Sequence, residues 1–178
     1  MAGKTPKEAI DNFANYFKES LSCVTEQWIT AFQESRNLFK LTCNPPAKLN
    51  KRAGGNLFLI ATQVLTTVTD PANEGCFKAK TREYSYRLVE TEDIAAADIV
   101  AYHWHPNDSE VRTPHLHIPA HPRVHFPTSR VCLEDFILML IKYFYEKVIK
   151  VKGRRGGRFC PSCRETLLVF SVLHRAPG

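Results

Sequence analysis

Histidine is concentrated in one short stretch of this chain. Six of the seven histidines fall between residues 103 and 125, and four of them form two H-x-H pairs. In an extended strand, residues i and i+2 point to the same face, so two neighbouring strands can gather four imidazoles on one surface. Imidazole transfers protons near neutral pH and is the commonest metal ligand in proteins. The clustered histidines are His103, His105, His115, His117, His121 and His125.

One interpretation of this stretch is acid/base chemistry on a phosphodiester. Metal-independent RNA cleavage needs a base for the 2′-hydroxyl, an acid for the leaving group and a cation for the charged transition state. The expected acid/base groups are His115, His117 and His125, and the expected cation is Arg130 or Arg112. This mechanism needs no cofactor, and it predicts a ribonuclease.

The segment from residue 125 to residue 130 adds an expected anion site. It leads into a predicted helix, whose N-terminal amides attract anions. The hydroxyls of Thr128 and Ser129 would contribute to the same site. Under this interpretation, His103 and His105 line the same face in a catalytic-supporting or metal-binding role.

Two further interpretations stay open for the histidines. In one, the H-x-H pairs bind a divalent metal ion, because His103-Trp-His105 followed by Glu110 has the ligand spacing of the first cupin metal motif. The flanking glycines and the second motif of cupins are absent from the chain. In the other, each histidine makes a structural hydrogen bond, an interpretation that suits His121 best.

Positive charge is concentrated in the C-terminal third. The chain has 24 Lys and Arg against 18 Asp and Glu, a net charge of +6. Residues 122–178 hold 11 against 4, a net +7, whereas the rest hold 13 against 14, a net −1. This excess favours RNA or another nucleic acid as partner, or an acidic protein, and a solvated basic surface fits it equally well. The GRRGGR loop supplies three candidate phosphate contacts, Arg154, Arg155 and Arg158, and predicts a non-catalytic binding module as a third possible function.

The six cysteines follow no disulfide-scaffold spacing, so most are expected to be reduced thiols. Cys160-Pro-Ser-Cys163 has the spacing of half a zinc site. A structural zinc site needs four ligands, and the chain has no second C-x-x-C pair. Two interpretations of Cys160 and Cys163 therefore stay open: a zinc site, or two unligated thiols in a turn.

The N-terminal region has the pattern of a helical segment. Thr5, Pro6 and Glu8 form a helix start with a capping box. Apolar residues then recur at helical spacing, which predicts one long helix or two shorter ones to about Asn37. The apolar face of this segment fits either a core or a homodimer surface.

The centre of the chain predicts strands. β-branched and alternating residues indicate strands at 57–69, 81–90, 98–105 and 113–118, with an antiparallel hairpin joining the last two. Tyr84 and Tyr86 share a strand face, where Tyr86 could stack a base or pack across strands. A long helix is predicted from a cap at Ser129 to Val148, followed by a final strand at 166–173.

These elements predict one α+β domain spanning residues 1–178. Its parts are a helical N-terminal extension (1–45), a core (55–150) and a C-terminal part (151–178). The core is an antiparallel β-meander covered by the long helix, and it carries the histidines. The C-terminal part holds the basic loop, the C-x-x-C pair and the last strand. The chain has no apolar run of transmembrane length and no signal-peptide pattern, so a cytoplasmic protein with no membrane contact is expected.

Four runs of this core resemble one known family. TREYSYRLVE, DIVAYHWHP, PHLHIP and HFPTSRVCLEDFILMLI look like the TumE-type toxins of bacterial and archaeal toxin–antitoxin pairs, over roughly residues 55–150. The resemblance implies a small toxin that acts on RNA and is neutralised by a cognate antitoxin. The N-terminal extension and the cysteine-containing basic tail depart from the family pattern. The positions that match the pattern are Tyr86, His103, His115, His117, His125 and Arg130.

Overall fold

The computed structural model describes residues 2–25, 29–35, 37–43, 45–50, 56–107, 111–121 and 123–144. Within these ranges an antiparallel sheet is combined with two helices, so the predicted α+β class is confirmed. The elements are, in chain order, β1 (Ala2–Gly3), α1 (Pro6–Leu21), β2 (Ile29–Ser35), β3 (Leu38–Cys43), β4 (Ala47–Asn50), β5 (Asn56–Thr69), β6 (Phe77–Val89), β7 (Asp98–Trp104), β8 (His115–His117), β9 (Phe126–Pro127) and α2 (Leu133–Tyr143).

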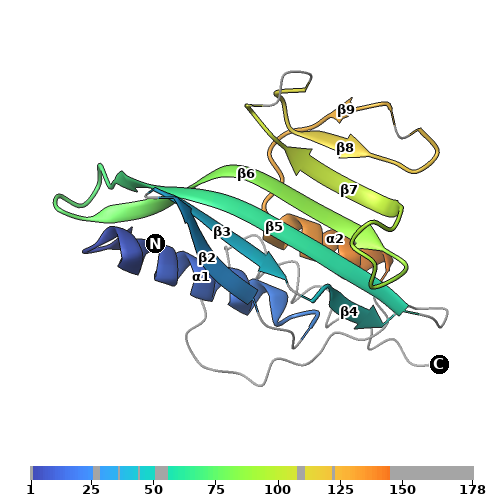
Figure 1. Ribbon diagram of the computed structural model, residues 1–178, viewed down its shortest axis with the longest axis horizontal. Coiled ribbons are helices and arrows are strands. Elements are labelled where there is room, and N and C mark those ends of the chain that lie inside the picture. The colour runs from blue at the N-terminus through green and yellow to red at the C-terminus, as the bar shows by residue number, and fades with distance from the viewer. Residues whose placement is uncertain are drawn as a thin grey trace, which may run out of the picture.

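The strands of the described part form a single sheet in the order β2-β3-β5-β6-β7-β8-β9. β1 adds to β6 and β4 adds to β5. The long strands β5 and β6 form the centre, and they pair from Phe58 opposite Val89 to Thr69 opposite Phe77. Figure 1 shows β7, β8 and β9 continuing the sheet on the side away from α1. The sheet thus ends in three short strands that carry the histidine-rich part of the chain.

Both helices cover one face of the sheet. Phe17 and Leu21 of α1 and Phe136 of α2 are buried in the same cluster as Tyr86 of β6. The Phe136 ring lies 5.7 Å from the ring centroid of Tyr86 and 5.8 Å from that of Tyr102. Because side chains alternate along a strand, the residues between these aromatics point to the other face. That other face is where the histidines of β7 lie.

The predicted helix start at Thr5 is confirmed, but the predicted helical continuation to about Asn37 is wrong. The Thr5 hydroxyl accepts a hydrogen bond from the Glu8 amide at 3.1 Å, and the helix ends at Leu21. β2 and β3 follow as an antiparallel pair, and β3 pairs in turn with β5. β2 lies within the predicted helical range, and its pairing with β3, from Ile29 opposite Cys43 to Ser35 opposite Leu38, overrides the helical spacing of the apolar residues.

The helix of the C-terminal half is shorter than predicted. It starts at Leu133 after an N-cap at Cys132, not Ser129, and it ends at Tyr143. Two hydrogen bonds keep the preceding segment extended: the Thr128 amide donates to the Pro114 carbonyl, and the Val131 amide donates to the Tyr84 hydroxyl. Val148 lies outside the described residues.

The four strands predicted in the core are confirmed as β5, β6, β7 and β8, with β6 starting at Phe77, before its predicted range. The predicted hairpin is the antiparallel pair β7–β8. The short strands β1, β4 and β9 were not predicted. The expected strand at 166–173 and the rest of the segment 151–178 lie outside the described residues.

The contact of Phe136 with both tyrosines predicts a large contribution to stability. The variant Phe136→Ala should lose about 3–5 kcal/mol of unfolding free energy, because it removes a fully buried ring and leaves a cavity. Urea unfolding followed by circular dichroism measures this. Tyr143→Ala on the same helix, where the ring is 60% exposed, should change it by less than about 0.5 kcal/mol. Equal losses in the two variants would contradict this packing.

Candidate functional site

Three short strands bring five histidines together. In the β7–β8 pair, His103 lies opposite His115 and Ala101 lies opposite His117. β9 then pairs with β8, with Phe126 opposite Leu116, and this pairing carries His125 to the same place. The sequence left open whether the two H-x-H pairs converge, and the structure brings them together. His121 is exposed in the loop between β8 and β9 and does not line the site.

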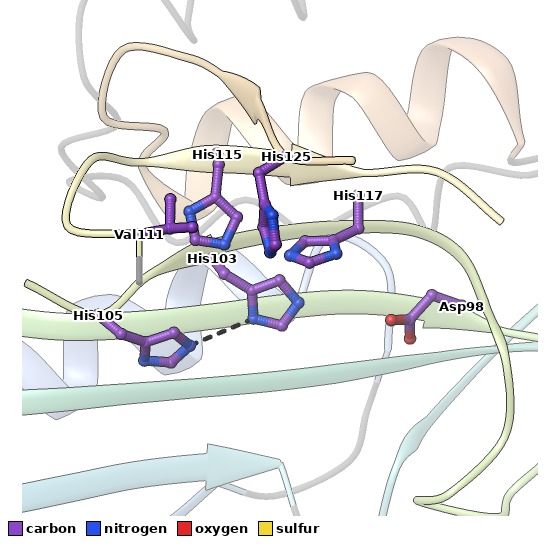
Figure 2. A pocket seen from close by; sticks show the side chains of 7 residues that line it. All are labelled: Asp98, His103, His105, Val111, His115, His117 and His125. Carbon is purple, nitrogen blue, oxygen red and sulfur yellow. Dashed lines mark hydrogen bonds between the residues drawn. The ribbon is translucent and has the colours of Figure 1, made fainter. Parts of the chain in front are cut away.

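The imidazoles of His115, His117 and His125 form the tightest part of the cluster. Their ring centroids are 4.9 Å apart for His115 and His117, 4.8 Å for His115 and His125, and 4.5 Å for His117 and His125. One nitrogen from each ring can be chosen so that all three lie within 4.8 Å of one another. Figure 2 shows the three rings converging above His103. Three imidazole nitrogens at such distances can hold one metal ion between them.

His103 and His105 extend the cluster along β7. The ring centroid of His103 is 4.9 Å from that of His117 and 5.9 Å from that of His115. A ring nitrogen of His105 lies 3.4 Å from a ring nitrogen of His103. The five rings, together with Asp98 and Val111, line a cavity of about 260 Å³. The cavity is large enough for a metal ion with bound water and a small molecule.

The tautomer of His115 is set by its backbone contact. Its Nδ1 lies 2.8 Å from the Thr113 carbonyl oxygen, which can only accept, so Nδ1 carries the proton. Nε2 is then left with a lone pair. A backbone carbonyl on the remote nitrogen is the usual partner that orients a metal-binding histidine.

His103 is held in its neutral form. Burial, which is the largest cause, and the neighbouring imidazoles of His117, His105 and His115 together lower its pKa to about 3. A neutral imidazole can accept a proton or a metal ion, whereas an imidazolium can do neither. His105, unlike His103, has an acidic neighbour: one of its ring nitrogens lies 3.8 Å from a carboxylate oxygen of Glu83.

Asp98 is a cavity residue that the sequence did not predict. It accepts a 2.6 Å hydrogen bond from the Nε of Arg87, and the same guanidinium donates to the carbonyls of Ile94 and Ala96. Asp98 is five residues from His103, so simple alternation along the strand would place it on the other face. The register shift between Leu88 and Val89, opposite Asp98, breaks that alternation. The extra residue is Ile99 of β7, because the consecutive residues Leu88 and Val89 pair with Val100 and Asp98.

Several predicted substrate-binding residues lie away from the cavity. Tyr86 is fully buried on the helix-covered face, where it stacks on Tyr84 at 4.9 Å. Arg130 lies on that face too, with its guanidinium 3.6 Å from the ring centroid of Trp104. The structure therefore does not bring Arg130 and His125 into one cavity, since β7 lies between Arg130 and the histidines.

The remaining predicted substrate-binding and metal-binding residues are exposed, are buried, or lie outside the described part of the chain. Ser129 and Arg112 are exposed, and Arg112 directly follows the cavity residue Val111. The Thr128 hydroxyl is buried and has no hydrogen-bond partner among the described residues. Outside the described residues lie Glu110, Arg154, Arg155, Arg158, Cys160 and Cys163.

No protein-family model, curated protein or solved structure matches this chain. In the described residues, neither helix has the length and apolar character needed to cross a membrane. The site must therefore be interpreted from its own geometry.

The neutral state of His103 predicts a pH-dependent stability. Its pKa is about 3 in the folded protein and 6.5 ordinarily, so between these values the unfolded chain takes up a proton that the folded chain does not. The free energy of unfolding should therefore fall as the pH is lowered from about 6.5 toward 3. Urea unfolding at a series of pH values, with a chelator present, measures this slope.

His103→Gln should flatten the pH dependence, because glutamine has no proton to gain. His121→Gln is the matched control, since His121 is exposed and outside the cavity. A slope that is the same in the wild-type protein and in His103→Gln would show that His103 is not the group responsible.

Proposed function

We propose that this protein is a metal-dependent enzyme that binds a divalent transition metal ion through His115, His117 and His125. The proposal depends on one observation, the approach of three imidazole nitrogens to within 4.8 Å of one another. Imidazole suits zinc, copper, iron and nickel ions, and three protein ligands leave a coordination position open. In zinc enzymes of this kind, that position holds a water molecule.

The cavity supports hydrolysis as the reaction class. A metal ion with three histidine ligands lowers the pKa of a bound water to about 7, which supplies hydroxide at neutral pH. His103, His105 and Asp98 line the same cavity as the three proposed ligands. None of the described residues lining the cavity is a lysine or arginine, so a substrate of low negative charge fits it best.

Metal binding can be measured directly on untagged protein. Isothermal titration with Zn²⁺ after chelator treatment should give one site per chain. His115→Ala, His117→Ala and His125→Ala should each weaken binding by more than about 100-fold, which is more than the loss of an outer-shell contact causes. His121→Ala, from the same histidine-rich stretch, should bind as the wild-type protein does.

Zinc bound by the cysteines must be distinguished from zinc bound by the histidines. The double variant Cys160→Ser/Cys163→Ser should retain stoichiometric Zn²⁺ if the histidines hold it. Loss of the metal in this variant, or its retention in the triple variant of His115, His117 and His125, would overturn the proposal. Co²⁺ absorption spectra provide a second readout, because nitrogen and thiolate ligands give different charge-transfer bands.

Hydrolysis can be tested with a small neutral ester. Cleavage of p-nitrophenyl acetate should stop in EDTA and return with added Zn²⁺. Cleavage that is insensitive to EDTA would show that the reaction does not need a metal ion.

Metal-independent RNA cleavage by a toxin with a cognate antitoxin remains a second candidate. It is supported by the five adjacent imidazoles, which could provide both an acid and a base, and by the resemblance of the core. Within the described part of the chain, Arg112, which follows the cavity residue Val111, is better placed for its phosphate contact than Arg130. RNA cleavage that persists in EDTA and is lost in both His117→Ala and His125→Ala would favour this function over the metal-dependent one.

A further inference from the structure

A second cavity lies on the opposite face of β7, at the start of α2. Its volume is about 200 Å³, and its walls come from β5, β6, β7 and the segment 130–135. Trp104 forms one wall, and it stands between His103 and His105 in the chain with its side chain on the other side of the sheet. None of the chemistry proposed for the histidines uses this cavity, so the two sites can be tested separately.

A buried amide in this cavity lacks a partner. Gln63 is 6% exposed, and its Nε2 donates to the Thr81 hydroxyl at 3.0 Å. Its Oε1 is buried and has no hydrogen-bond partner among the described residues. Native structures rarely leave a buried acceptor unsatisfied, because its desolvation is unfavourable. A ligand with an N–H or O–H donor would satisfy this oxygen.

Two residues of opposite charge also line the cavity. Arg130 and Asp135 are both wall residues, yet no ion pair joins them within the described part of the chain. The Arg130 guanidinium is stacked on the Trp104 ring at 3.6 Å, which leaves its N–H groups available in the guanidinium plane. One carboxylate oxygen of Asp135 accepts from the Cys132 thiol at 3.0 Å. A ligand with two charged ends could bridge the two residues.

We propose that this cavity binds a small zwitterion with an amine and a carboxylate, of the α-amino acid class. The carboxylate would pair with Arg130, and the amine would donate to Gln63 Oε1 and to Asp135. The volume suits such a ligand, since sites for drug-sized molecules are larger, about 300–1,000 Å³. Arg130, Cys132 and Asp135 are exposed, so the cavity can be reached from solvent.

Ligand-observed NMR on the full chain can test this with defined probes. Glycine, L-alanine and L-serine have both charged groups, propionate has only the carboxylate, and ethanolamine has only the amine. At least one amino acid should bind, and propionate and ethanolamine should bind at least about tenfold more weakly, a difference of about 1.4 kcal/mol. Binding of either single-charge probe as tightly as the amino acids would overturn the proposal, and so would no binding by any probe.

Two variants assign the binding to this cavity. Gln63→Leu removes the unpaired oxygen and Arg130→Gln removes the charge, and each should weaken amino acid binding at least about tenfold. Arg123→Gln is the matched control, because Arg123 is exposed and is not a wall residue. If Gln63→Leu does not fold, Arg130→Gln still decides, since Arg130 is exposed. Unchanged binding in Arg130→Gln would place the ligand elsewhere.

Discussion

The register of the β7–β8 pair is the constraint on which the candidate site depends. It places His103 opposite His115 and aligns the two H-x-H pairs on one face. A slip of one residue would turn one of these pairs toward the opposite face. On the other side of the sheet, Tyr102 packs on Phe136 and Trp104 packs beside Tyr84, which anchors β7 to α2 and to β6. Core packing on one face of β7 thus orients the imidazoles of His103 and His105 on the other.

The segment between β9 and α2 connects the site to the core. Its Thr128 amide donates to the Pro114 carbonyl next to β8, and its Val131 amide donates to the Tyr84 hydroxyl of β6. These bonds hold the chain directly after β9, whose pairing with β8 positions His125. They also keep residues 128–131 extended, so α2 begins later than a hydroxyl cap at Ser129 would have it. The same contacts therefore help to explain why His125 lies beside His115 and His117, and why Arg130 lies away from these three histidines.

Local patterns predicted much of this structure, and long-range pairing decided the rest. The alternation in β7 and in β8 placed the two histidines of each H-x-H pair on one face of their own strand, but only the register of the two strands brings both pairs to the same face. Alternation could not place Asp98, because an extra residue in β7 between Asp98 and Val100 breaks the alternation. The spacing of Val24, Trp28 and Phe32 fits a helix, but Phe32 lies in β2, where pairing with β3 overrides this pattern. The separation of Arg130 from the histidines depends on which face the chain reaches after β9, and no short window of sequence contains that information.

The alternation in β7 also limits how this chain can change over evolutionary time. Between Tyr102 and His105, each aromatic side chain of the core is followed by an imidazole of the cavity. Exchanging one side chain alters one face only, whereas deleting one residue would move imidazoles into the core and an indole into the cavity. The turn at residues 70–76 joins β5 to β6 and lines neither cavity, so a change in its length alters neither the core side nor the cavity side of β7. Descendants of this chain should therefore vary in length at that turn, while β7 keeps its length even where its residues differ.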